Sequence, residues 1–350
     1  MIKVSVVVPC YNAAKYLDKC IEQLLHQTIG INDLEIILVD DASTDRGETK
    51  SLIQRYEQHF PETIIAVFLE KNVRQGGARN AGVSYARGEY IAFCDADDWL
   101  LEETLEHVYH VAKEYDADIV SFARRYTNMR DTSVILEKGD GSKMFRLETV
   151  EERKAFLLNM QEEDHSSQNK LFRASLIRDN QIAFAEEMCM EEASFTIPAR
   201  LYARRSFHLD EKLYICYLSP GSTMRDKNWE SKKWDNLQVW MNVIEESRAR
   251  GMFLEYQQEL EYLFFTQGVG WSLVFIFQRG GILTKEEWKI FAGITKKVVP
   301  AIRENPYMKN ESHPLNRAWG DLLLTVLDME FTDENADLAN DAVGKCVQAF

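Results

Sequence analysis

Short apolar runs alternate with segments of helical periodicity along the first hundred residues. The runs are rich in β-branched and aromatic residues, as in parallel strands that are buried on both faces. Strands that alternate with helices in this way indicate βαβ units. We therefore expect an α/β fold with a Rossmann-like, mainly parallel sheet. The expected strands are residues 4–8, 34–39, 64–68 and 90–94, and the expected helices are 13–27, 49–60 and 76–86.

The rest of the chain predicts a second domain. A further helix and strand are expected between residues 105 and 126, and the polar stretch 127–143 is expected to form an exposed loop. From residue 228 onward the periodicity is helical almost throughout. A chain of 350 residues is long enough for two domains of ordinary size. We expect an α/β domain at 1–227 and a helical domain at 228–350.

Composition and charge narrow the class of protein. Lys and Arg number 41 and Asp and Glu number 56, so the net charge is −15 at pH 7. Such a balance argues against broad nucleic-acid binding, which needs a surplus of cations, but it leaves room for a small basic pocket. The six cysteines are scattered and form no C-x-x-C pair, which indicates free thiols in a reducing compartment.

No targeting or membrane-spanning segment is expected. The apolar run at residues 4–8 is too short for a signal peptide and is expected to be a buried strand. The sequence contains no uninterrupted apolar run of the roughly 18 residues that a spanning helix needs. The longest mainly apolar stretch, at 263–277, is interrupted by polar residues and glycines and is expected to be a buried core helix. These features predict a cytoplasmic protein.

Acidic and polar residues follow three of the predicted strands directly. In open α/β sheets the ligand crevice lies beyond the carboxyl ends of the strands. Helix capping explains a single acid at such a place, but three acids within four residues repel one another unless a cation joins them. The residues at the strand ends are Tyr11 and Asn12, then Asp40 and Asp41, and then Asp95, Asp97 and Asp98.

The D-A-D-D segment at 95–98 has the chemistry of a divalent-cation site. Oxygen ligands without Cys or His favour a hard cation, Mg²⁺ or Mn²⁺, over zinc. Two carboxylates on such an ion leave coordination positions open for a diphosphate. Asp95, Asp97 and Asp98 are therefore the candidate metal ligands.

Several segments in order resemble the family 2 glycosyltransferases. They are VSVVVPCYN at 4–12, EIILVDDAS at 35–43, GGARNAG at 76–82, YIAFCDADD at 90–98 and NKLFRASLI at 169–177, and the likeness continues to SPGST at 219–223. The resemblance implies the A-type nucleotide-diphospho-sugar transferase fold, followed here by a helical C-terminal domain. It also implies an enzyme that transfers a hexosyl or N-acetylhexosaminyl group from a nucleotide-sugar with the help of Mn²⁺ or Mg²⁺.

The resemblance also implies a pocket for the donor's base. Tyr11 and Asp41 match the family residues that hold the nucleobase, and Pro9 would line the same pocket. The Asp41 carboxylate is suited to accept from the imide N–H of uracil, so we expect a UDP-sugar. The alternative for Asp41 is an acid that caps the next helix.

Further residues match positions around the donor's ribose and diphosphate. Asp95 resembles the acid that bonds the ribose and Asp97 the acid that ligates the metal, while Asp98 either shares one of these roles or caps a helix. Arg79 lies in the GGARN segment that opens the predicted helix at 76–86, and it would approach an anionic donor or would be a structural arginine on the surface. Lys170 would lie near the diphosphate, or would simply be solvated.

An inverting transferase needs a base that takes the proton of the acceptor hydroxyl. In the family this base is the second acid of a Glu-Asp pair that opens a helix, and here the pair reads Glu191-Glu192. The resemblance makes Glu192 the base, although its side chain is one methylene longer than the usual aspartate. Glu186 and Glu187 lie nearby as competitors, and an acidic first turn of a helix is the structural alternative.

The resemblance indicates only the general class of acceptor and whether the enzyme is processive. The Q-x-x-R-W motif and the membrane spans of the processive synthases are absent, so we expect one sugar to be added per encounter. The expected acceptor is a cell-surface polysaccharide, a wall polymer, a lipid-linked precursor or a glycoprotein. Peripheral association with the inner face of the membrane stays open.

The helical domain carries six of the seven tryptophans, at helical spacings. Large aromatic residues fit a packed core, but they also fit a platform for an acceptor sugar or an interface between copies of the chain. In position and helical character this domain resembles the C-terminal domains of wall-polymer transferases that assemble through them. The tryptophans are Trp229, Trp234, Trp240, Trp271, Trp288 and Trp319.

Two other functions are weighed against the transferase. A nucleotidyltransferase shares the sheet and the acids, but it uses a Gly-rich phosphate loop after the first strand, where this chain has P-C-Y-N at 9–12. A catalytically inactive subunit that binds a sugar-nucleotide or acts as a scaffold is conceivable because Glu192 replaces the usual aspartate.

Overall fold

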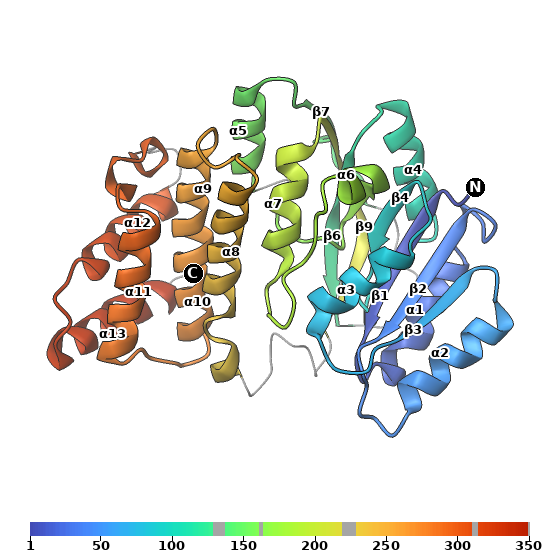
Figure 1. The fold of residues 1–350 in the computed structure, drawn as a ribbon, viewed down its shortest axis with the longest axis horizontal. Coiled ribbons are helices and arrows are strands. Elements are labelled where there is room, and N and C mark those ends of the chain that lie inside the picture. The colour runs from blue at the N-terminus through green and yellow to red at the C-terminus, as the bar shows by residue number, and fades with distance from the viewer. Residues whose placement is uncertain (129–136, 161–163, 219–228, 310–313, 349–350) are drawn as a thin grey trace. The chain divides into compact units, whose positions relative to one another are not determined.

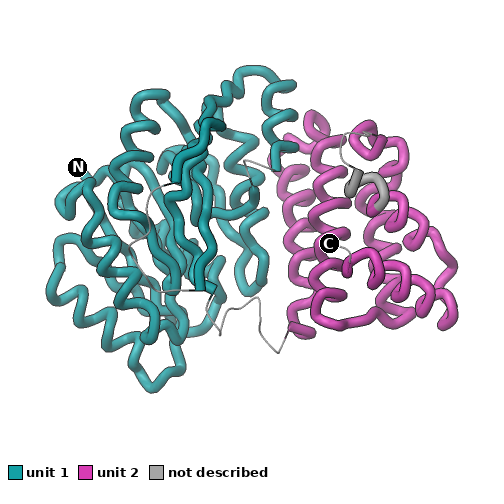
Figure 2. Tube along the Cα trace, turned by 180° about the vertical axis from the view of Figure 1, so that it is seen from behind, with its two compact units in different colours: residues 1–226 teal, residues 227–350 magenta. Residues whose placement is uncertain are grey.

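The computed structural model describes residues 1–128, 137–160, 164–218, 229–309 and 314–348. The chain divides into two compact units, Met1–Asp226 and Lys227–Phe350 (Figure 2).

A sheet of nine strands forms the centre of the first unit's described residues (Figure 1). Its order is β3-β2-β1-β4-β8-β6-β9-β5, and β7 pairs with β9. The strands are β1 (Val4–Cys10), β2 (Leu34–Asp40), β3 (Ile64–Phe68), β4 (Tyr90–Phe93), β5 (Trp99–Leu100), β6 (Ile119–Thr127), β7 (Lys143–Arg146), β8 (Lys170–Arg173) and β9 (Arg205–Tyr217).

Helices cover both faces of this sheet, as the apolar runs predicted. Alternate residues of β1 point to opposite faces: Val6 and Val8 pack in the core with α1, α2 and α4, whereas Val7 packs in the core with α3, α5, α6 and α7 (Figure 1). The helices are α1 (Ala14–Leu25), α2 (Glu48–His59), α3 (Arg74–Tyr85), α4 (Thr104–Glu114), α5 (Val150–Leu158), α6 (Ala174–Asp179) and α7 (Glu192–Tyr202).

The expected fold class is confirmed, with mixed pairing beyond the first half of the sheet. β3, β2, β1 and β4 are parallel, as predicted. β8 is antiparallel to both β4 and β6, and β9 is parallel to β6. Within the polar stretch at 127–143, residues 129–136 lie outside the described part of the chain, and Lys138 forms an isolated bridge with Glu211.

This topology brings the ends of several strands to one edge. Because β8 runs against both of its neighbours, β6 and β9 point in the same direction as β1, β2 and β4. Their carboxyl ends therefore lie together at the edge where α/β sheets bind their ligands. The residues after β1, β2 and β4 are the candidates named from the sequence.

The described residues of the second unit are helical. They form α8 (Asp235–Ala249), α9 (Gln257–Leu263), α10 (Trp271–Phe277), α11 (Lys285–Val298), α12 (Pro314–Leu327) and α13 (Asp333–Gln348), with a π-helical turn η3 (Phe264–Gly270) and the 3₁₀ turns η2 (Trp229–Lys232), η4 (Ile302–Glu304) and η5 (Pro306–Lys309).

The apolar helix at the centre of this unit behaves as a core element. By length and composition Gln257–Phe277 is suited to cross a membrane, but 72% of an apolar 18-residue window within it is buried in the protein. Trp240 and Trp288 are also fully buried, which fits the core interpretation for these two tryptophans. Trp271, by contrast, is 53% exposed.

Candidate active site

The D-A-D-D segment forms a turn that β9 holds from inside the protein. The backbone N–H of Asp95 donates to the Tyr214 hydroxyl oxygen at 3.1 Å, and this hydroxyl donates to Asp98 Oδ2 at 2.8 Å. The backbone N–H of Tyr217 donates to Asp98 Oδ1 at 2.7 Å. Both oxygens of Asp98 are thus engaged by β9, so this buried side chain fixes the turn, while Asp97 is only half-buried.

The charges of the turn affect one another strongly. Burial, followed by the charges of Asp95 and Asp97, raises the pKa of Asp98 to about 8. Burial is the main cause of this shift, and repulsion from the two neighbouring carboxylates adds to it.

Two side chains fix the carboxylate of Asp95. Arg79 Nη2 donates to Asp95 Oδ1 at 2.8 Å, and Gln168 Nε2 donates to Asp95 Oδ2 at 3.0 Å. Both partners are buried, whereas the Asp95 side chain keeps 21% of its surface exposed. Asp95 is therefore held in one orientation and still faces outward.

Arg79 also joins the acidic turn to the Glu191-Glu192 pair. It is fully buried in α3, and its Nη1 donates to Glu191 Oε1. Burial alone would lower the pKa of Arg79, but the charges of Asp95 and Glu191 outweigh burial and raise it. Both expectations for Arg79 need correction: it does not lie on the surface, and its guanidinium does not face a donor but is fully buried and links two acidic segments.

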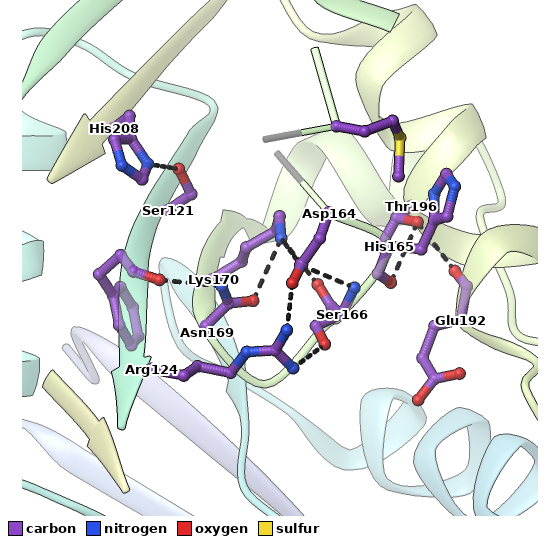
Figure 3. A network of polar contacts seen from close by, with 12 residues as sticks. Ser121, Arg124, Asp164, His165, Ser166, Asn169, Lys170, Glu192, Thr196 and His208 are labelled. Atoms are coloured by element: carbon purple, nitrogen blue, oxygen red, sulfur yellow. Dashed lines mark hydrogen bonds and ion pairs between the residues drawn. The ribbon is translucent and has the colours of Figure 1, made fainter. Parts of the chain in front are cut away.

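The two glutamates at the start of α7 have different surroundings. Glu191 is 1% exposed, and burial together with the neighbouring Glu192 raises its pKa to about 8 against the lowering effect of Arg79. Glu192 is half-buried, and Figure 3 shows its carboxylate directed away from the polar network around Asp164. The nearby competitors are engaged elsewhere: Glu186 with Asn80, and Glu187 with Lys71.

A glycine allows α3 to lie this close to the Glu191-Glu192 pair. A Cβ at Gly76 would lie 2.2 Å from the carbonyl oxygen of Ala185 and 2.9 Å from Glu191 Cγ. The absence of a side chain at Gly76 is therefore needed for the first turn of α3 to pack against the segment that leads into α7.

The predicted base-binding residues lie at the ends of β1 and β2. Pro9 is buried, Tyr11 is 49% exposed, and the Asp41 side chain is buried. The backbone N–H of Val73 donates to Asp41 Oδ1 at 2.7 Å. Burial raises the pKa of Asp41 to about 6, against the lowering effect of this hydrogen bond. Asp41 does not cap the next helix, because α2 begins at Glu48 and Asp45 accepts from the backbone N–H of Thr49 there.

Both expectations for Lys170 need correction. Its Nζ is buried and donates to Asp164 Oδ1 at 3.2 Å, to the carbonyl oxygen of Ser166 at 2.9 Å and to Asn169 Oδ1 at 3.1 Å (Figure 3). An ammonium group has three donors, so these contacts use its full capacity. Lys170 is therefore neither solvated nor free to bind a diphosphate, and it stabilises the segment that precedes β8.

Two residues of the site were not identified from the sequence. Tyr214 belongs to β9, a strand that was not expected from the sequence, and Gln168 lies in a polar segment without a motif of its own. The only available signal for Gln168 was its place immediately before NKLF at 169–172.

Comparisons with known proteins identify the family of this chain. The family model described as Glycosyl transferase family 2 matches residues 5–180. The glycosyltransferase GlyG of Streptococcus pneumoniae is 30% identical over 286 residues, which cover 74% of this chain and 89% of GlyG. The poly(ribitol-phosphate) beta-glucosyltransferase of Bacillus spizizenii is 31% identical over 227 residues, which cover 63% of this chain.

The aligned part of this chain spans about a third of that last relative, 33% of its length. Among solved structures, Staphylococcus aureus TarS 1–349 in complex with UDP-GlcNAc superposes with a TM-score of 0.72 at 23% identity, covering 99% of this chain and 92% of TarS 1–349. This superposition extends the shared fold through the helical C-terminal unit. The motifs, the fold and the family match together show that this chain belongs to glycosyl transferase family 2.

Proposed function

We propose that the chain is an inverting, metal-dependent transferase that moves a single hexosyl or N-acetylhexosaminyl group from a UDP-sugar to an acceptor hydroxyl. The observation that carries the proposal is the double ion pair of Arg79. This one guanidinium holds Asp95, from the acidic turn, and Glu191, from the start of α7. The residues proposed for the donor and for the base therefore belong to a single site.

The nucleobase would bind beyond the ends of β1 and β2. Tyr11 offers an exposed ring on which a base can stack, and Pro9 closes the end of β1. Asp41 Oδ1 accepts from Val73, and its other oxygen is proposed to accept from the imide N–H of uracil. Structures of TarS in complex with UDP and with UDP-GlcNAc are consistent with a uridine donor for this fold.

Among the described residues, no group of three or more His, Cys, Asp or Glu side chains is arranged to hold a metal ion. The set of three ligands expected from the sequence, Asp95, Asp97 and Asp98, is therefore corrected to two, and these two carboxylates are proposed to hold a hard divalent cation that is shared with the donor. We assign Asp97, with Asp95 beside it, to Mn²⁺ or Mg²⁺, and Asp98 to fixing the turn. Diphosphate oxygens and water would complete the coordination that such ions prefer. The bound ion would offset the negative charge of the departing UDP.

Glu192 is proposed as the base. Its carboxylate takes the proton of the acceptor hydroxyl while the hydroxyl oxygen forms a bond to the anomeric carbon. The bond from this carbon to the β-phosphate oxygen breaks, and UDP leaves with the electron pair. Attack from the face opposite to UDP inverts the anomeric configuration. Glu192 suits this role better than Glu191, because Glu191 is buried against Arg79.

The acceptor is proposed to be a cell-surface polymer or its lipid-linked precursor, modified in the cytoplasm or at the inner face of the membrane. Curated relatives that act on poly(ribitol-phosphate) support a wall polymer. The helical unit is proposed to bind this acceptor or to join copies of the chain, and its exposed Trp271 is a candidate contact for either.

The alternative function is a catalytically inactive subunit that binds a sugar-nucleotide. The observation that supports this alternative is the glutamate at position 192, which replaces the aspartate usual in the family.

Thermal unfolding with UDP, ADP, UDP-glucose and UDP-GlcNAc, each with Mn²⁺ or with EDTA, tests the donor-binding part of the proposal. A ligand at a hundred times its Kd stabilises the folded state by about 2.7 kcal/mol. We expect the uridine ligands to raise the midpoint only with Mn²⁺. The proposal fails if none of them does.

A further inference from the structure

Gln168 places a buried amide group directly beside the donor acids. Its Nε2 donates to Asp95 Oδ2 at 3.0 Å. A carboxylate without a proton only accepts hydrogen bonds, so the nitrogen of the amide must face Asp95 and the oxygen must face elsewhere. The orientation of the Gln168 amide is therefore fixed by its contact with Asp95.

The oxygen of this amide is buried and has no hydrogen-bond partner among the residues that the structure describes. The same is true of the hydroxyl of the neighbouring Ser167. Buried polar groups in native proteins are nearly always paired, and an unpaired one calls for an explanation. A ligand that donates a hydrogen bond to Gln168 Oε1 supplies one.

The segment that carries Gln168 is held rigidly by its neighbours (Figure 3). Arg124 donates to both Asp164 and Ser166, and Lys170 donates to three oxygens of the same segment. Asn169 exchanges two hydrogen bonds with the backbone of Phe122, at 2.8 and 3.0 Å. The amide of Gln168 is thus preorganised, which is what a specific contact with a ligand requires.

The same segment also contacts the helix that carries the proposed base. The Thr196 hydroxyl donates to the carbonyl oxygen of Glu192 at 3.0 Å and lies 3.3 Å from the carbonyl oxygen of His165. Gln168 is therefore tied to Asp95 on one side, and its segment to α7 on the other. In the proposed reaction the transferred sugar lies between the donor acids and the base.

We propose, on the basis of the proposed function, that Gln168 recognises the transferred sugar: its amide nitrogen holds Asp95, and its amide oxygen accepts a hydrogen bond from a hydroxyl or acetamido N–H of that sugar. This contact distinguishes the sugar moiety and leaves recognition of UDP to other residues. It makes Gln168 a determinant of donor specificity.

Calorimetry with Mn²⁺ tests this role on UDP, UDP-glucose, UDP-GlcNAc and the monodeoxy analogues of both sugars. A site built to bond a substrate hydroxyl rejects the analogue that lacks it, because a buried group is left unpaired. We expect wild type to bind one analogue about tenfold more weakly than its parent. Gln168→Met, of similar length but without the amide, should bind parent and analogue equally, and it should weaken binding of the UDP-sugars more than binding of UDP. Gln54→Met, on the exposed face of α2, is the matched control and should behave as wild type.

Three results would overturn the inference. The first is that wild type binds every deoxy analogue as tightly as its parent UDP-sugar and binds the two parents equally. This result is obtained with the wild-type protein alone. The second is that Gln168→Met keeps the discrimination of wild type. The third is that Gln168→Met weakens the binding of UDP as much as the binding of the UDP-sugars. The amide would then act only by holding Asp95. If wild type binds no uridine ligand at all, the proposed function itself fails, and the inference falls with it.

Discussion

The buried guanidinium of Arg79 is bonded to the buried carboxylate of Glu191, the residue that precedes the proposed base. The same guanidinium holds Asp95 at 2.8 Å. A charge of either sign that loses its partner inside a protein is costly, so each of the three side chains depends on the others. The position of the first turn of α7 is thereby coupled to that of the acidic turn.

Removing Arg79 is expected to destabilise the fold as well as the site. Arg79→Met leaves Glu191 buried without a cation, and breaking a buried pair in this way costs about 3–5 kcal/mol. The control is Arg55→Met, because Arg55 pairs with Asp18 on the surface, where ion pairs contribute about 0–1 kcal/mol. Urea unfolding measures both. Equal midpoints for the two variants would show that the buried pair does not hold this part of the structure.

The second prediction separates the two glutamates by function. Glu192→Gln keeps the shape of the side chain but removes its basicity, so kcat should fall by a factor of about 10²–10⁴ while UDP affinity stays nearly unchanged. Glu191→Gln should lower kcat less, because this side chain faces Arg79 and not the acceptor. Steady-state kinetics with calorimetry of UDP binding checks both variants. A wild-type rate in Glu192→Gln together with an inactive Glu191→Gln would reverse the assignment.

Adding a side chain at Gly76, in the first turn of α3, should disturb the neighbouring Glu191-Glu192 pair. In Gly76→Ala the new methyl meets the carbonyl oxygen of Ala185, so the segment before α7 must shift, and overpacking of this kind costs about 1–3 kcal/mol. We expect lower stability and lower kcat.

Gly293→Ala is the matched control for this change. Gly293 is an exposed residue of α11, and a Cβ there meets nothing within 4 Å. Replacing glycine by alanine inside a helix should stabilise the protein by up to about 1 kcal/mol. Chemical unfolding measures the change in the free energy of unfolding for each variant. The two changes have opposite signs if the close approach at Gly76 matters and the same sign if it does not.

The buried carboxylate of Asp41 should lower the stability of the folded protein. Its proposed role in binding uracil explains why a destabilising residue stands at this position. Its pKa is about 6 in the folded protein, against 3.8 for an ordinary aspartate. Between these values the unfolded chain has already lost the proton that the folded protein keeps, so the contribution of Asp41 to stability falls as pH rises from about 4 to 6. Asp41→Asn does not titrate. Relative to wild type, this variant should therefore gain stability over that range and keep the gain above pH 6.

Binding of UDP should change in the opposite sense. Loss of a hydrogen bond from uracil to a charged acceptor costs about 1.5–3 kcal/mol, so Asp41→Asn should bind UDP at least tenfold more weakly. Thermal unfolding at pH 4 and pH 7.5, with calorimetry at pH 7.5, measures both effects. A stability difference that does not vary with pH, or unchanged UDP affinity, would remove Asp41 from the proposed base pocket.

Much of the fold was accessible from the sequence because both faces of the parallel strands are apolar. The predicted strand at 64–68 agrees with the bounds of β3, and the other early elements agree within a few residues. β9 was missed because Asp210, Glu211 and Lys212 interrupt its apolar pattern. The structure accommodates these charges with partners from distant segments, such as Lys138 for Glu211 and the backbone N–H of Gly141 for Asp210.

The candidate site was predictable where a motif carried it and not where tertiary contacts decide it. The acids at the strand ends were visible as sequence. Whether Asp98 faces outward depends on Tyr214, and whether Lys170 is solvated depends on Asp164, Ser166 and Asn169. No pattern within either segment contains that information.

Release of UDP from a UDP-sugar is the decisive test of the proposed transferase activity. UDP-glucose and UDP-GlcNAc would be incubated with the protein and Mn²⁺, with a poly(ribitol-phosphate) acceptor and without it, and free UDP measured over time. We predict slow release without acceptor, faster release with it, and none with EDTA or in Asp97→Asn, whose folding is checked by thermal unfolding. Binding of a UDP-sugar without release of UDP under any of these conditions would contradict the proposed activity, because an inactive binding subunit would behave in this way.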